Sequence, residues 1–119
     1  MSHVFECDDE TVWDPSNQVG ELYLRMLRAA AEVFDTPTGL TSLSGDHHVI
    51  DRAEYGRMVH ALLAVRGESG HVYLRRMLDG VLPICIAVYE CIGGVVTPST
   101  EDEQKYMTEV RTMDLPMGF

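Results

Sequence analysis

The chain has few of the features that assign a sequence to a specialised class of protein. Its 119 residues include only three cysteines, and no two of these form a C-x-x-C pair, so a disulfide-rich miniprotein is excluded. The most apolar stretch, 81–92, contains Pro83 and Glu90 and is too short to span a bilayer. No basic segment precedes an apolar one near residue 1, so we expect no signal peptide and a cytoplasmic protein with reduced thiols.

Basic residues are scarce as well, and the acidic excess is concentrated at the two ends. Nine Lys and Arg face nineteen Asp and Glu, which gives a formal net charge of −10. Residues 1–14 carry five acidic and no basic side chains, and residues 101–119 carry five acidic and two basic ones. Such ends repel nucleic acid and anionic membranes, whereas a basic protein would be attracted. The alternative is that the acidity serves only solubility.

A hydrophobic content of 45% over this length supports one core, so we expect a single domain covering residues 1–119. Residues 1–13 predict a small β-hairpin around an acidic turn, anchored by Trp13. The amphipathic patterns in residues 14–94 predict the helical core. Residues 95–119 predict a short helix, Glu101–Arg111, and a tail from Leu115 to Phe119.

Three amphipathic segments make up the predicted core. The first opens at Asp14-Pro15, an N-cap followed by proline at the first helical position, and has these apolar residues at helical spacing: Val19, Leu22, Tyr23, Met26, Leu27, Ala30, Val33 and Phe34. Leu24 falls on its polar side. The second opens with a capping box, Asp51–Glu54. The third runs from about His71 to Ile92, and Pro83 on its outer side favours a kink over a break.

These elements predict an all-α protein, a small bundle of three to four helices with a short N-terminal β-hairpin. The connection between the first two helices, residues 40–50, has the composition of a polar loop. The third helix has the widest apolar face, which indicates either a central position or a surface shared with a second copy.

Candidate reactive side chains are few. His71 near a helix start, with Tyr73, Arg75 and Glu68 close in sequence, could act as a general base, and Asn17 could line a polar pocket. Asp46, His47 and His48, followed by Asp51, are metal-competent side chains, but adjacent residues rarely bind one ion, and a solvated loop is the simpler interpretation. We therefore expect no metal and no cofactor.

An apolar pocket is the alternative basis for a function. Its candidate lining consists of aromatic and sulfur-containing side chains: Trp13, Tyr23, Met26, Met77, Cys85 and Tyr89. The same residue types fill ordinary cores, and core packing explains them without a ligand.

The segment around Trp13 resembles a motif, W-x-P-S-N-x-V, that opens a family of small uncharacterised actinobacterial proteins of the Streptomyces type. Trp13, Pro15, Ser16, Asn17 and Val19 match it. The similarity continues through Pro37–Gly39, Ile50-Asp51 and Ser69–His71, and it covers most of residues 3–94. Eight Arg against one Lys fit the GC-rich genome of such an organism. The resemblance implies an architecture and an origin but no activity.

The leading hypothesis is a small acidic non-enzymatic protein that binds another protein, as an immunity-type or accessory factor, and forms a homodimer. The rival is a small helical enzyme or ligand-binding protein of bacterial secondary metabolism, with the apolar pocket and with His71 and Asn17 as polar contacts. Whether the chain is catalytic is left open by the sequence.

Overall fold

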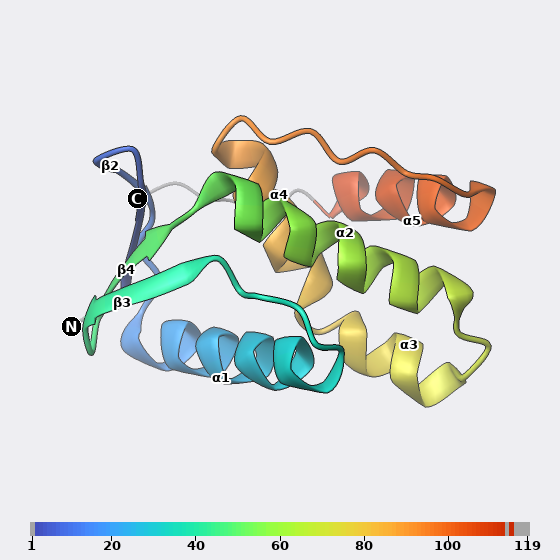
Figure 1. Cartoon of the computed structure of the whole chain (residues 1–119), viewed down its shortest axis with the longest axis horizontal. Helices are drawn as coiled ribbons and strands as arrows, with labels where there is room; N and C mark the ends of the chain where they lie inside the picture. The colour runs from blue at the N-terminus through green and yellow to red at the C-terminus, as the bar shows by residue number, and fades with distance from the viewer. Residues whose placement is uncertain (1, 114, 116–119) are drawn as a thin grey trace.

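In the part of the chain that the structure describes, a four-stranded mixed sheet forms one end and five helices extend from it (Figure 1). The computed structural model describes residues 2–113 and 115. The strands are β1 (Val4–Cys7), β2 (Glu10–Trp13), β3 (Leu40–Ser44) and β4 (His47–Ile50), in the order β2-β1-β4-β3. β1 and β4 are parallel, while β1–β2 and β3–β4 are antiparallel hairpins.

The predicted N-terminal hairpin is confirmed. β1 pairs with β2 in the register Glu6 to Thr11 and Cys7 to Glu10. The connecting Asp8 and Asp9 both have positive φ angles, 52° and 64°, which a tight hairpin turn requires and which Asp tolerates better than most residues. The hairpin packs on the helices through Trp13, which is 8% exposed.

The all-α prediction is wrong, because residues 40–50 form a second hairpin and not a loop. β3 pairs with β4, and β4 also pairs with β1, so the two hairpins join into one sheet and the fold is α/β. The segment has polar side chains because most of β3 is exposed at the edge of the sheet. Only alternate residues of β4, His48 and Ile50, are buried, so its apolar signal is too short to stand out.

The first two long helices are α1 (Asn17–Val33) and α2 (Arg52–Glu68). The predicted start of α2 is confirmed, since the Asp51 carboxylate accepts a hydrogen bond from the Glu54 amide at 3.0 Å. α1 begins two residues later than predicted, since its N-cap is Ser16 and not Asp14. The backbone carbonyl of Pro15 accepts from the His3 amide, and Ser16 bridges to Ser2, so these residues belong to the sheet edge.

The predicted third helix is broken in two. α3 (Val72–Leu78) and α4 (Leu82–Cys91) are separated by a turn around Gly80. Pro83 lies in the first turn of α4, where its missing N–H costs nothing, and it is buried, which contradicts the predicted outer position. The last helix, α5 (Glu101–Thr112), is confirmed.

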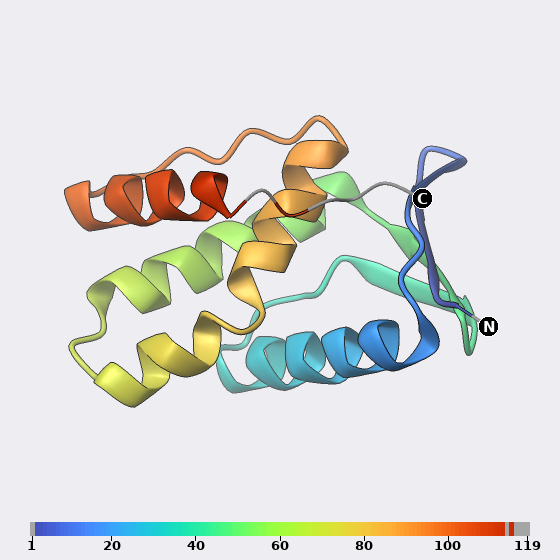
Figure 2. The same ribbon diagram turned by 180° about the vertical axis from the view of Figure 1, so that it is seen from behind.

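The core lies between one face of the sheet and the inner sides of α1, α2 and α4 (Figure 2). α2 packs against α3, α4 and α5 and is the central helix. α1 packs differently from the prediction: Leu24 and Leu27 are 2% and 0% exposed, while Val19, Leu22 and Val33 are 48%, 61% and 73% exposed. The helix therefore has two apolar stripes, and only one is in the core.

Two further predictions concern the ends of the molecule and its relation to membranes. Apart from Leu115, the predicted tail at 115–119 lies outside the described residues. Among the helices that the structure describes, none combines the length and apolarity that crossing a bilayer would need.

Candidate functional site

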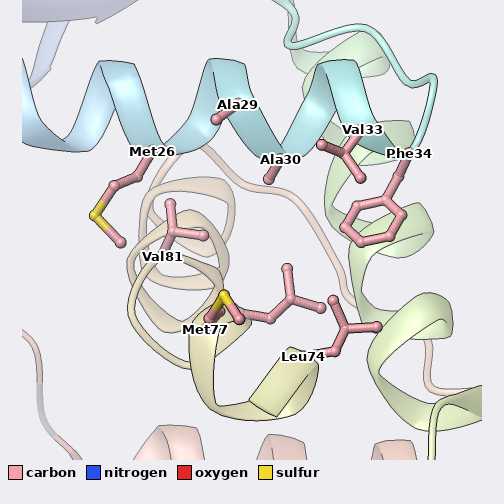
Figure 3. Close-up of a pocket in the computed structure, with 9 residues that line it drawn as sticks. Met26, Ala29, Ala30, Val33, Phe34, Leu74, Met77 and Val81 are labelled. Atoms are coloured by element: carbon pink, nitrogen blue, oxygen red, sulfur yellow. The ribbon is translucent and has the colours of Figure 1, made fainter. Parts of the chain in front are cut away.

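The second apolar stripe of α1 forms one wall of an open groove, and α3 with the start of α4 forms the other (Figure 3). The groove has a volume of about 430 Å³. Every side chain that lines it is apolar: Met26, Ala29, Ala30, Val33, Phe34, Leu74, Met77, Leu78 and Val81. Met77 is 67% exposed and Val33 is 73% exposed, so two large apolar side chains of the rim lie in water.

The stripe on α1 has the spacing of a helix–helix interface. Its members follow one another at alternating intervals of three and four residues: Val19, Leu22, Met26, Ala29 and Val33. We call these five residues the α1 seam. They occupy the a and d positions of two heptads, which lie along one side of a helix. Four of the five are exposed and Met26 is half-buried, so the described part of the chain leaves the seam largely uncovered.

Charged residues flank the seam on one side only. Arg25 and Glu32, which are both exposed, occupy two of the three g positions next to it, the third being the uncharged Gln18. The Arg25 guanidinium already donates to Glu21 at 2.7 Å, one turn earlier on the same helix. The e positions on the other flank, Tyr23 and Ala30, carry no charge, and Tyr23 is buried in the core.

The residues predicted to form one apolar pocket are distributed over three places. Met26 and Met77 face each other across the groove. Trp13, Tyr23 and Cys85 lie in the core, where the Tyr23 hydroxyl contacts the Cys85 Sγ at 3.6 Å. Tyr89 is half-buried elsewhere, beside Asp51 and Arg52.

The buried phenols and the thiol are held in their neutral forms. The Tyr23 hydroxyl is hydrogen-bonded to that of Tyr55, and burial raises the pKa of both phenols well above the usual range. Burial also raises the pKa of the Cys85 thiol to about 11. A buried thiol with that pKa stays protonated at neutral pH and is a poor nucleophile, so we assign this cluster to packing.

The two catalytic candidates, His71 and Asn17, lie at the starts of different helices, α3 and α1. His71 is the exposed N-cap residue of α3, and its ring lies 5.8 Å from that of Tyr73. Asn17 is the exposed first residue of α1. Neither lines the groove.

The predicted metal candidates Asp46, His47 and His48 point in different directions. Asp46 accepts from Ser44 at 3.0 Å, and His47 pairs with Glu6 at 3.1 Å on the outer face of the sheet. His48 faces the core and is 1% exposed. No group of three or more metal-competent side chains occurs in residues 2–113 and 115.

The structure brings together a polar set that the sequence analysis missed. His48 Nε2 lies 3.0 Å from Nδ1 of His3, another fully buried imidazole, and His48 Nδ1 lies 2.8 Å from the Ser42 hydroxyl. Glu21 lies beyond His3, and Arg28 donates to Ser42 at 3.1 Å. The signal was present in the alternation of inward residues, His3 just before β1 with Phe5 on it, and His48 with Ile50 on β4, but it is visible only once β4 is known to be a strand.

Comparison with known proteins gives one match. The model of DUF6086, a family of unknown function, matches residues 1–119. No curated protein and no solved structure matches the chain.

Proposed function

Because the chain belongs to DUF6086, a family of unknown function, we propose its function from its own surface: it is a protein-binding factor that acts as a homodimer through the α1 seam. The observation that carries the proposal is the heptad spacing of five mostly exposed apolar residues on a helix whose other apolar stripe is already buried. Large exposed apolar surfaces of this kind mark interaction sites.

The charges beside the seam favour a second copy of the same chain as the partner. In an antiparallel pair of α1 helices, Leu22 packs near Val33 of the partner and Met26 near Ala29 of the partner. This register brings the g positions of the two helices together, so Arg25 of each protomer lies next to Glu32 of the other. A parallel pair would place g beside e, where Tyr23 and Ala30 carry no charge.

A small-molecule site is the weaker use of the groove. Its volume is within the range of ligand pockets, but such pockets combine apolar walls with a few polar groups that orient the ligand. The groove has only apolar side chains along its walls, and it is open to solvent. A helix of a partner protein fits these features better, because it satisfies its own backbone hydrogen bonds.

The acidity supports a further, basic partner for the dimer, as an accessory or immunity-type factor would have. Asp9 and Glu10 are exposed at the tip of the first hairpin, far from the α1 seam, and remain available in the dimer, while the neighbouring Asp8 pairs with Arg52 at 2.6 Å. A cytoplasmic location belongs to the same proposal, supported by the free thiols of Cys7, Cys85 and Cys91. An actinobacterial origin is supported by the preference for Arg over Lys and by the motif from Trp13 to Val19.

The proposal is tested by sedimentation equilibrium of the wild-type chain. A protomer of 13.3 kDa is expected to sediment with twice that mass at micromolar concentration and to dissociate on dilution. A species of 13.3 kDa throughout, up to several hundred micromolar, would rule out the homodimer and leave only a foreign partner for the seam.

A further inference from the structure

Four polar side chains at the edge of the sheet form a continuous series of contacts that leads from the surface into the core: Ser42, His48, His3 and Glu21. Ser42 is exposed on β3, which is the edge strand of the sheet. His48, opposite Ser42 in the β3–β4 register, and His3 are buried, at 1% and 2% exposure. Glu21 on α1 lies at the far end, with its Oε2 atom 3.6 Å from His3 Nε2.

The negative charge of Glu21 favours one direction for the hydrogen bonds that link His3, His48 and Ser42. A neutral imidazole donates from one nitrogen and accepts at the other, whereas a carboxylate only accepts. Glu21 lies 3.6 Å from His3 Nε2, beyond hydrogen-bond distance, but its negative charge favours the hydrogen of His3 on that nitrogen. In this tautomer His3 Nδ1 accepts from His48 Nε2. It follows that His48 Nδ1 carries a free lone pair, and the Ser42 hydroxyl donates to it at 2.8 Å.

The result is a hydroxyl bound to the basic nitrogen of an imidazole whose other side is held by a second group. This is the arrangement that activates a serine nucleophile, with a general base that is itself oriented by a further hydrogen bond. We propose that Ser42 is a nucleophile that takes an acyl group from an activated ester, with His48 as its general base and with His3 and Glu21 as positioning residues.

Arg28 supplies the remaining element of the site. Its guanidinium donates to the Ser42 hydroxyl oxygen at 3.1 Å, so it stabilises the negative charge that develops on that oxygen as its proton leaves. It also favours a neutral His48: burial first, and then the positive charge of Arg28, lowers the pKa of the His48 imidazole. The base is consequently unprotonated at neutral pH.

The reaction balances with an ester and water as the reactants. The Ser42 oxygen forms a bond to the acyl carbon while its proton passes to His48 Nδ1. The bond from that carbon to the leaving oxygen then breaks, and His48 returns the proton, so an alcohol departs. Water then attacks the acyl-serine with the same base, which releases the acid and restores the Ser42 hydroxyl.

The test uses a fluorophosphonate probe on the full-length protein, because this probe reports an activated serine without requiring the natural substrate. The Ser42 oxygen forms a bond to phosphorus, the phosphorus–fluorine bond breaks, and fluoride leaves. Intact-mass and peptide-mapping analysis is expected to find one adduct, on Ser42. Ser42→Ala should lose it, and Ser44→Ala, a matched change on the same exposed strand, should keep it.

Two further measurements distinguish a Ser42 hydroxyl activated by His48 from one that reacts only because it is exposed. His48→Gln should slow labelling at least about 100-fold in a chain whose circular dichroism is unchanged. Labelling of the wild type should fall as the pH is lowered through the pKa of His48, because a protonated imidazole cannot accept the proton. No adduct on the folded wild type under conditions that label a known serine hydrolase, or an equal adduct in Ser42→Ala, would overturn the proposal. If His48→Gln unfolds the chain, the site of the adduct and its pH profile in the wild type decide the matter.

Discussion

Leu22→Glu is expected to weaken self-association by at least about 100-fold while leaving the protomer folded. Leu22 is 61% exposed in the protomer, so a glutamate there remains in water and keeps a good helix former in α1. In the antiparallel pair, the same position packs near Val33 of the partner. Each protomer then loses the burial of a leucine, about 1.5–3 kcal/mol, and two copies contribute. Since each 1.4 kcal/mol is tenfold in Kd, a loss of this size is readily measured.

The matched control for Leu22→Glu adds the same charge elsewhere. Gln104→Glu on the exposed side of α5 changes the net charge equally but lies outside the α1 seam. Its sedimentation should match that of the wild type. A Leu22→Glu protein that dimerises as tightly as the Gln104→Glu protein would show that the seam is not the interface.

The second large expected effect is on the free energy of unfolding, and it distinguishes the buried apolar stripe of α1 from the exposed one. Leu24→Ala is expected to lower the free energy of unfolding by about 2–5 kcal/mol, because Leu24 is 2% exposed and its truncation leaves a cavity in the core. Leu22→Ala, two residues away, removes the same atoms from a side chain that is 61% exposed. It should change the unfolding free energy of the monomer by less than about 0.5 kcal/mol.

Urea denaturation at a concentration below the dimer Kd measures both variants, since dimerisation would otherwise add to the apparent stability. Comparable losses for the two leucines would mean that both stripes are in the core. That result would remove the physical basis of the proposed interface.

The pair of leucines also explains what could be predicted from the sequence of α1. Apolar residues occupy two adjacent stripes of this helix, and periodicity cannot tell which stripe faces the core. The sequence-based prediction places Val19 and Leu22 inside and Leu24 outside, whereas in the structure Leu24 is buried and Val19 and Leu22 are exposed. The distinction depends on the sheet, because Phe5 and Trp13 pack against Tyr23 and so set the rotation of the helix.

Elements with strong local signals were predicted well. The capping residue Asp51, the hairpin turn at Asp8-Asp9 and the helix after Thr100 each depend on a few neighbouring residues, and the structure contains all three. The second hairpin was missed because its stability comes from pairing with β1, more than forty residues away.

The polar set at Ser42 was missed for the same reason. His47-His48 indicates a solvated or metal-binding loop when the segment is taken as irregular. In a strand, successive side chains point to opposite faces, so only His48 turns inward. His3 reaches it through the parallel pairing of β1 with β4, which no local pattern encodes.

The central claim, that α1 pairs with a second α1 in antiparallel orientation, is tested most directly by exchanging the two charges beside the seam. In the antiparallel dimer, residue 25 of each protomer lies next to residue 32 of the other, so there are two such contacts. Arg25→Glu places two negative charges at each contact, and Glu32→Arg places two positive charges at each contact. Each variant alone is expected to dimerise about tenfold more weakly than the wild type, since exposed pairs are worth about 0.2–1 kcal/mol each.

An equimolar mixture of the two variants restores opposite charges at both contacts. It is therefore expected to form heterodimers with nearly wild-type affinity, measured by sedimentation with one variant carrying a fluorophore. The double variant Arg25→Glu with Glu32→Arg should recover in the same way as a homodimer. A mixture that associates no better than its separate components would contradict the antiparallel seam.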